Sequence, residues 1–252
     1  FSAMSNLHFS SGRSKDLSGL QEMMRDGLGF EQPFDGEHHW TVSPQPHIDK
    51  IKIPTYFGSD WSFYWDHLPG AFAGWEGVGD IPKRMLIGPK PHPWRPFAAY
   101  HMESLRWYDH WLKGMDTGVM DGPPIQLYIE GENRWRGEAE WPPARAEWKK
   151  FFLGGSSGGL EGSLSENGGA QVERTYVNDP MNNEWRYGNP RLVYRTEPMS
   201  SPMELTGPLS MHLVARSSIE DTDWIVTLLD ESPSGETRIL TRGCLRASHR
   251  EL

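Results

Sequence analysis

The sequence predicts an α/β layer followed by an all-β region. Between residues 51 and 114 strand-like and helix-like segments alternate, which is typical of a parallel sheet covered by helices. After Asp121-Gly-Pro-Pro124 the helical periodicity ends, and short β-rich runs alternate with turn formers, which favours a β-sandwich. A chain of 252 residues can bury a core in one large or two modest domains. We therefore expect a domain boundary near Pro123.

The first 46 residues hold few regular elements. A weak amphipathic pattern predicts a helix over 17–28, and the polar, aromatic segment 31–48 is expected to be a loop. That segment contains Glu37-His38-His39-Trp40, which resembles a set of metal ligands. Adjacent histidines cannot both face one ion from a regular element, so we predict no metal site there.

The α/β layer is predicted as strand, long loop, strand, loop and helix. The strands are expected over 51–57 and 85–87, each followed by a turn that contains glycine. The helix is expected over 96–113, because a proline marks its start and Lys113-Gly114 its end. In such a layer ligands bind at the carboxyl ends of the parallel strands.

Six short runs in the second half have the composition of strands, and Gly-, Pro-, Asn- and Ser-rich turns separate them. They cover residues 125–129, 148–153, 192–194, 209–215, 224–229 and 238–240.

Charge and composition exclude several classes of partner. A net charge of −9 disfavours binding to nucleic acid or anionic lipid, so a small-molecule substrate is expected. No apolar run approaches the roughly 20 residues that span a bilayer, so no membrane contact is expected. Cys244 is the single cysteine, so an internal disulfide is excluded, and its side chain is expected to be partly buried. The sequence contains no nucleotide-binding motif, so no cofactor is predicted. We expect a cytoplasmic location and leave secretion and assembly into homo-oligomers open.

Two titratable side chains follow the two predicted strands. Asp60 comes after the first strand in Gly58-Ser59-Asp60-Trp61, and His92 comes after the second in a proline-rich loop. An acid and a histidine on successive strand ends are two members of a Ser-His-Asp triad, in which the carboxylate orients the imidazole. Asp66 could serve as the acid instead of Asp60. The purely structural interpretations are an Asx-type turn for Asp60 and a solvated charge for Asp66.

The sequence offers no convincing nucleophile. Ser156, in Gly154-Gly-Ser-Ser-Gly158, matches the G-x-S-x-G pattern of a nucleophile elbow. That pattern has meaning only at a turn from strand to helix, and residues 159–169 are expected to be a flexible loop.

Several motifs together resemble the cocaine esterase and X-prolyl dipeptidyl-peptidase group of serine hydrolases, from about Pro33 to the end of the chain. They are Ile51-Lys-Ile-Pro54, Leu86-Ile-Gly-Pro89 with His92, Leu105-Arg-Trp-Tyr-Asp-His-Trp-Leu-Lys-Gly114 with Asp116-Thr-Gly118, Pro124 to Trp135 with Trp141-Pro142, Asp221-Thr-Asp-Trp224, and Gly243-Cys-Leu-Arg-Ala-Ser-His-Arg-Glu251.

The resemblance implies an α/β-hydrolase domain, a helical cap and a jelly-roll β-sandwich. Residues 1–46 would be a remnant of the cap and its connection. Residues 47–122 would be the C-terminal part of the hydrolase domain, and residues 123–252 a truncated jelly roll. The serine and the oxyanion-hole tyrosine would lie in an N-terminal hydrolase half that precedes Phe1.

The resemblance also assigns roles. His92 matches the catalytic histidine of the family's Gly-Pro-x-x-His motif. The family reads Gly-Trp-x-Asp after the first strand, and alignment on Trp61 puts Phe63 at the acid's position. The acid thus remains either Asp60 or Asp66.

Our leading hypothesis is a serine hydrolase of ester or amide bonds in small acyl substrates, acting through an acyl-enzyme. The isolated 252 residues are expected to be inactive, because the serine lies outside them. The alternative is a non-catalytic module that binds a ligand or a partner, and a metal-dependent hydrolase ranks last.

Overall fold

The computed structural model describes residues 36–62, 64, 67–90, 98–155, 159–169, 172–178 and 191–250. These ranges do not include four residues singled out above, His92, Asp66, Phe63 and Ser156, or the predicted helix over 17–28. The described residues up to 139, together with 212–250, form one compact unit, and residues 140–211 form a second.

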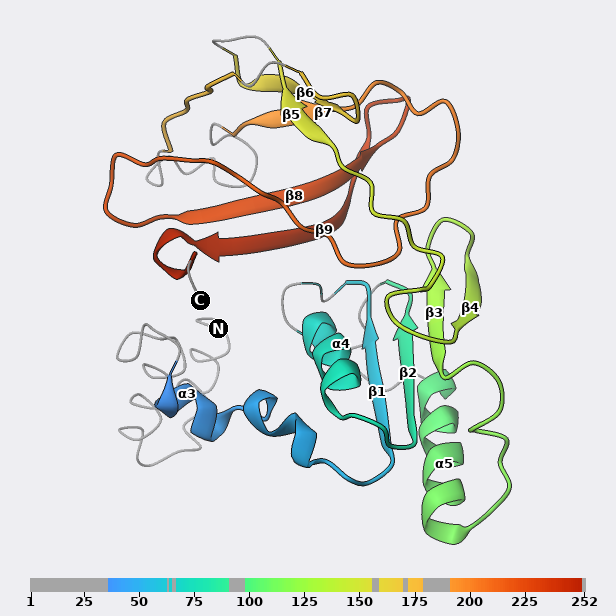
Figure 1. The fold of residues 1–252 in the computed structure, drawn as a ribbon. Coiled ribbons are helices and arrows are strands. Elements are labelled where there is room, and N and C mark those ends of the chain that lie inside the picture. The colour runs from blue at the N-terminus through green and yellow to red at the C-terminus, as the bar shows by residue number, and fades with distance from the viewer. Residues whose placement is uncertain are drawn as a thin grey trace, which may run out of the picture. The chain divides into compact units, whose positions relative to one another are not determined.

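The first unit is built on a four-stranded sheet in the order β1-β2-β3-β4 (Figure 1). The strands are β1 (Thr55–Asp60), β2 (Lys83–Gly88), β3 (Ile125–Ile129) and β4 (Arg134–Glu138). The first three are mutually parallel, as the alternation of strands and helices predicted, and β4 returns antiparallel to β3. Hydrogen bonding therefore continues across the predicted boundary between residues 122 and 123, and the boundary itself stays a prediction.

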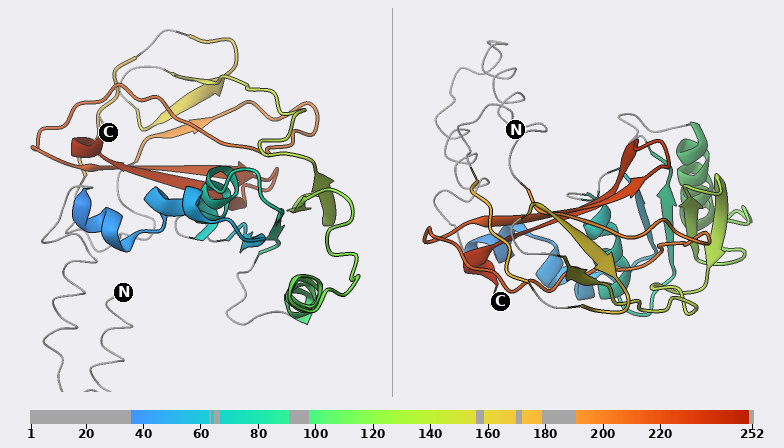
Figure 2. Two further views of the ribbon diagram at one scale, coloured as in Figure 1. Left: turned by 60° about the horizontal axis from the view of Figure 1, so that its bottom comes forward. Right: turned by 90° about the horizontal axis from the view of Figure 1, so that it is seen from above.

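Two helices cover opposite faces of this sheet, α4 (His67–Gly77) and α5 (Ala98–Lys113) (Figure 2). Phe57 of β1 packs against Gly74 of α4, where an added Cβ would lie 2.9 Å from Phe57 Cδ1. The preceding residue, Tyr56, contacts Trp107 of α5 with ring centroids 5.2 Å apart. Successive side chains of a strand point to opposite faces, so these contacts place the two helices on either side of β1.

The core lies where β2 and β3 meet. Their inward side chains are completely buried and belong to Met85, Ile87, Ile125 and Leu127. Strand β3 alternates buried and half-buried residues, whereas β2 buries residues on both faces, as expected for a central parallel strand.

Several predicted elements are confirmed. Helix α5 ends at Lys113 as expected, and β3 has the predicted bounds 125–129. The predicted runs 224–229 and 238–240 lie within β8 (Asp223–Glu231) and β9 (Thr237–Arg246), which form an antiparallel hairpin.

The prediction of a long loop between the first two strands was wrong, because α4 lies there. Three glycines and Pro69 give its sequence a low helix propensity. Burial of Leu68, Ala71 and Trp75 stabilises the helix through tertiary packing instead. The predicted loop over 31–48 likewise contains α3 (Glu37–Val42) and the 3₁₀ helix η1 (Gln45–Lys50), which are too short to show a periodic apolar face.

The first strand is also shifted from its predicted position. It begins at Thr55, whose amide donates to Pro82 O at 3.0 Å, because Pro54 cannot donate to a ladder. It continues to Asp60, so this residue is the last residue of the strand.

The second unit contains a three-stranded sheet in the order β5-β6-β7. Its strands are β5 (Phe152–Gly154), β6 (Glu161–Ser165) and β7 (Val193–Arg195). Strand β6 falls inside the predicted flexible loop over 159–169, because both its edges are paired. The predicted strand over 148–153 shortens to β5, since its ladder with β6 spans only three residues. The jelly roll stays a prediction.

Two further predictions fail in the second half of the chain. Residues 209–215 form no strand and pair with none of the described strands, and most of their large apolar side chains are exposed. Cys244, expected to be partly buried, is exposed on β9.

No helix in the described ranges is long and apolar enough to cross a bilayer.

Candidate functional site at the strand ends

Asp60 is the most deeply buried acid among the described residues, with 1% of its surface exposed. It is the last residue of β1 and pairs with Gly88, the last residue of β2. Its Oδ1 accepts hydrogen bonds from the Ser62 amide, at 2.8 Å, and from the Ser62 hydroxyl. Asp60 therefore caps an Asx-type turn, as the purely structural interpretation predicted. It also places a carboxylate at the carboxyl edge of the sheet.

Trp61 ties this turn to the neighbouring strands. Its amide donates to Gly88 O at 3.2 Å, and its indole Nε1 donates to Tyr128 O of β3 at 2.7 Å. The first bond connects the ends of β1 and β2, and the second reaches β3. The turn after β1 is thus held rigidly to the sheet.

Tyr100, in the first turn of α5, closes over the end of β2. A Cβ added at Gly88 would lie 2.9 Å from Tyr100 Cζ and closer still to its hydroxyl oxygen. Burial, and secondly the charge of Asp60, raise the pKa of Tyr100. Tyr100 therefore stays protonated beside the buried carboxylate, and Gly88 is needed because no larger residue leaves room for it.

Lys90 ends the described part of the chain that leads toward His92. Its amide donates to Glu130 Oε1 at 2.9 Å, and its ammonium donates to Ile239 O of β9 at 3.0 Å. Burial lowers the pKa of Lys90, the carboxylate of Glu130 opposes this effect, and the charge of Arg238 adds to it. The approach to His92 is thus fixed to the edge of the sheet where Asp60 lies.

Of the predicted site residues, the structure describes Asp60 alone; His92 and Asp66 lie outside the described residues. Sequence reasoning missed Tyr100, Lys90 and Glu130. The glycine that ends an apolar strand was a signal for the first of these, because such a glycine often marks a close approach. No sequence signal connects Lys90 with Glu130, since 40 residues separate them.

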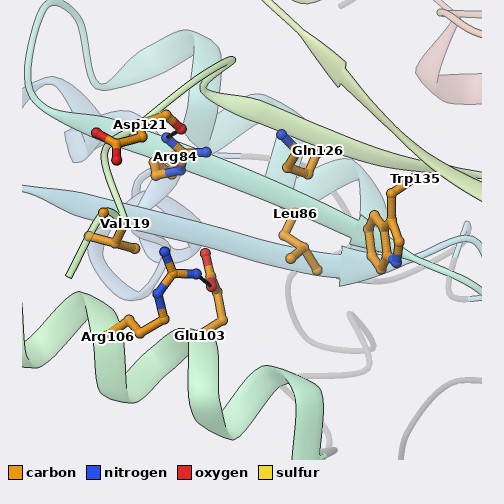
Figure 3. A pocket seen from close by; sticks show the side chains of 9 residues that line it. Arg84, Leu86, Glu103, Arg106, Val119, Asp121, Gln126 and Trp135 are labelled. Atoms are coloured by element: carbon orange, nitrogen blue, oxygen red, sulfur yellow. Dashed lines mark hydrogen bonds and ion pairs between the residues drawn. The ribbon is translucent and has the colours of Figure 1, made fainter.

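A groove of about 280 Å³ lies between the sheet and α5 (Figure 3). Its lining is formed by Arg84, Leu86, Glu103, Arg106, Gly118, Val119, Asp121, Gln126 and Trp135. Most of its charges are already neutralised or bound. Arg106 pairs with Glu103 at 3.0 Å, and Arg84 donates to the carbonyls of Asp121 and Pro123 at 3.2 and 2.9 Å.

The acids of Asp221-Thr-Asp-Trp224 have structural partners. Asp221 accepts hydrogen bonds from the hydroxyl and amide of Ser248, and Asp223 pairs with Arg246 across the β8–β9 hairpin at 2.9 Å. These bonds hold the pKa of both carboxyls below its usual range. No cluster of three or more His, Cys, Asp or Glu suited to a metal ion occurs in the described part of the chain.

Residues 117–252 match the family model of the X-Pro dipeptidyl-peptidase C-terminal non-catalytic domain. A Mycobacterium bovis protein that carries the name of a serine esterase is 30% identical over 281 aligned positions, covering 90% of this chain and 44% of that protein. The cocaine esterase of a Rhodococcus species is 30% identical over 57% of this chain and 30% of its own length. This chain thus spans less than half of the length of either relative.

Two solved structures show a weaker likeness. A CocE/NonD family hydrolase from Staphylococcus aureus has 18% identity and a TM-score of 0.40, covering 47% of this chain and 21% of that one. An aminopeptidase from a thaumarchaeon has 16% identity and a TM-score of 0.46, covering 82% of this chain and 42% of that one. TM-scores this low support no conclusion about the fold.

Proposed function

Because the chain belongs to the cocaine esterase and X-Pro dipeptidyl-peptidase group of hydrolases, with a C-terminal domain of the X-Pro dipeptidyl-peptidase type, we propose that it carries two members of a catalytic triad. The protein would be a serine hydrolase that cleaves ester or amide bonds in small acyl substrates. His92 is the general base and acid, Asp60 orients it, and the nucleophilic serine lies outside this chain.

The observation that carries this proposal is the buried carboxylate of Asp60 at the carboxyl end of β1, opposite Gly88. Adjacent strands lie about 4.8 Å apart, so the two strand ends are neighbours. His92 follows Gly88 by four residues, a stretch that spans at most about 14 Å when fully extended. An imidazole at position 92 can therefore reach the carboxylate of Asp60.

Asp66 is the other acid that could serve, because it too follows β1 within a few residues. Asp60 is favoured by its burial and by its rigid attachment to the ends of β1 and β2 through Trp61. A carboxylate that orients a histidine must itself be held in one place.

The proposed chemistry proceeds through an acyl-enzyme. The serine oxygen attacks the acyl carbonyl while His92 Nε2 takes the serine proton, and His92 then gives that proton to the departing alcohol or amine. Water attacks the acyl-enzyme in the same way and releases the acid. Throughout, Asp60 accepts a hydrogen bond from His92 Nδ1 and stabilises the imidazolium without taking the proton.

A non-catalytic binding module is the second candidate, and it is favoured by the description of the matched domain as non-catalytic. That match begins at residue 117, whereas Asp60 and His92 both precede it. The description therefore applies to the part of the chain that follows the proposed catalytic residues.

The test uses the full-length protein that contains this chain. A fluorophosphonate probe should label its serine, and an activated ester such as p-nitrophenyl acetate should be hydrolysed. His92→Ala and Asp60→Asn should each lower kcat, the latter about 10⁴-fold because the imidazole is left in the wrong tautomer. Asp66→Asn is the matched control and should stay close to wild type.

The outcomes separate the candidates. Absence of fluorophosphonate labelling would favour the binding module. A large loss in Asp66→Asn with none in Asp60→Asn would move the acid to Asp66. The 252-residue chain alone should hydrolyse no ester, so turnover by that fragment with loss on His92→Ala would overturn the proposal.

A further inference from the structure

Lys90 is held at both its backbone and its side chain, by elements far apart in the sequence. Its amide hydrogen is bonded to the carboxylate of Glu130, in the turn after β3, at 2.9 Å. Its ammonium donates to the carbonyls of Ile239 and Leu240 in β9, at 3.0 and 3.5 Å. The same ammonium lies 5.8 Å from the ring centroid of Tyr64, in the turn after β1.

These contacts are stronger than those of an ordinary surface lysine. The side chain is half-buried, so its hydrogen bonds to carbonyls are less screened by water. Burial lowers the pKa of Lys90 and the charge of Arg238 adds to this effect, while the charges of Glu130 and Asp60 oppose it. Because an ionised donor makes the stronger hydrogen bond, the ammonium is the form that holds β9 to this edge of the sheet.

The place of Lys90 in the chain gives this anchoring a consequence. Gly88 ends β2 opposite Asp60, Lys90 follows two residues later, and His92 two residues after that. A backbone fixed at Lys90 leaves only one intervening residue, Pro91, whose φ is itself restricted by its ring. Motion of the backbone at Lys90 would therefore displace His92 directly.

We propose that Lys90 is a positioning residue, which fixes the start of the segment that carries His92 to the turn after β3 and to β9. This proposal rests on the assignment of His92 as the catalytic histidine. It gives residues 117–252, matched to a non-catalytic domain, a specific part in the reaction: Glu130 and β9 hold the backbone from which the general base projects.

The same strand offers a matched control. Lys83, at the opposite end of β2, donates to the carbonyls of Trp75 and Gly79 at 2.7 and 3.0 Å and lies 4.6 Å from the Trp75 ring centroid. It has the same kinds of contact as Lys90 but lies at the amino end of β2. Loss of its ammonium should cost stability without displacing His92.

The experiment compares Lys90→Met, Lys90→Arg, Glu130→Ala and Lys83→Met in the full-length protein, with His92→Ala measured in parallel. The readouts are kcat and KM for an activated ester, the rate of fluorophosphonate labelling, and the melting temperature. Lys90→Met and Glu130→Ala should lower kcat about 10- to 100-fold with KM nearly unchanged, because a misplaced base impairs the chemical step rather than binding.

Lys90→Arg should recover most of the lost activity, since a guanidinium can donate to the same carbonyls. Lys83→Met should lower the melting temperature and leave kcat close to wild type. If Lys90→Met behaves like Lys83→Met, Lys90 is merely structural and the inference is wrong, although the proposed function stands. If His92→Ala retains full activity, the proposed function itself is wrong.

Discussion

The hydroxyl of Tyr100 lies directly over the Cα of Gly88, where any side chain on residue 88 would have to be. This contact joins the first turn of α5 to the end of β2, beside the buried carboxylate of Asp60. The end of β2 therefore depends on a residue without a side chain, and three predictions follow from this and two other contacts.

Gly88→Ala should destabilise the protein by about 1–3 kcal/mol, because the new methyl overlaps the Tyr100 hydroxyl and forces the ring away from the end of β2. Urea unfolding of the full-length protein measures the effect. Tyr100→Phe removes the hydroxyl that the new methyl meets, so the double variant should recover part of the loss. Gly58→Ala is the control, since nothing lies within 4 Å of a Cβ added at Gly58. Equal stability of the two single variants would contradict the contact.

Tyr56 should make the stability depend on pH in the alkaline range. Its hydroxyl donates to Glu103 at 3.0 Å, and burial, followed by the charge of Glu103, raises its pKa. A tyrosine whose pKa is raised by folding stabilises the protein fully below the unfolded pKa of about 10. That contribution is lost as the pH rises toward the higher pKa of the folded state.

Denaturant unfolding between pH 8 and 11 tests this expectation. Wild type should lose stability more steeply above pH 10 than Tyr56→Phe, which has no phenol to ionise at this position. Tyr108→Phe changes an exposed tyrosine on α5 and should retain the steep dependence of wild type. Identical curves for wild type and Tyr56→Phe would argue against the raised pKa.

Arg84→Lys should cost about 1–3 kcal/mol of stability despite the retained charge. The buried guanidinium donates through two nitrogens to the carbonyls of Asp121 and Pro123, and so holds the loop before β3 to β2. A lysine ammonium lacks this planar fork and leaves at least one of these two part-buried hydrogen bonds unmade. Arg134→Lys, in an exposed ion pair, is the control and should change the unfolding midpoint little.

Elements whose boundaries are set by nearby residues could be predicted from the sequence, whereas an element that depends on distant contacts could not. Helix α5 and strand β3 were predictable because their boundaries are set locally, by Gly114 after the helix and by the apolar run that becomes buried in β3. Helix α4 was not, because its glycine-rich sequence disfavours a helix until Leu68 and Trp75 find a buried surface.

In the candidate site, too, the choice of Asp60 depends on local sequence and its surroundings depend on distant contacts. Asp60 could be chosen from its place after an apolar run, since the pleat of a strand and the turn that follows it are local features. Its burial, and its pairing with Gly88, depend on the register between β1 and β2. That register is set by side chains from both strands and both helices, so no single segment contains it.

The sequence by itself determined that an acid and a histidine follow two parallel strands, because strand propensity and turn chemistry act over a few residues. Only the tertiary structure decided that Tyr100 covers Gly88, and that Glu130 and Ile239 hold Lys90. These contacts join residues that are 12 to 149 positions apart, and such pairs form only when packing of the core brings their elements together.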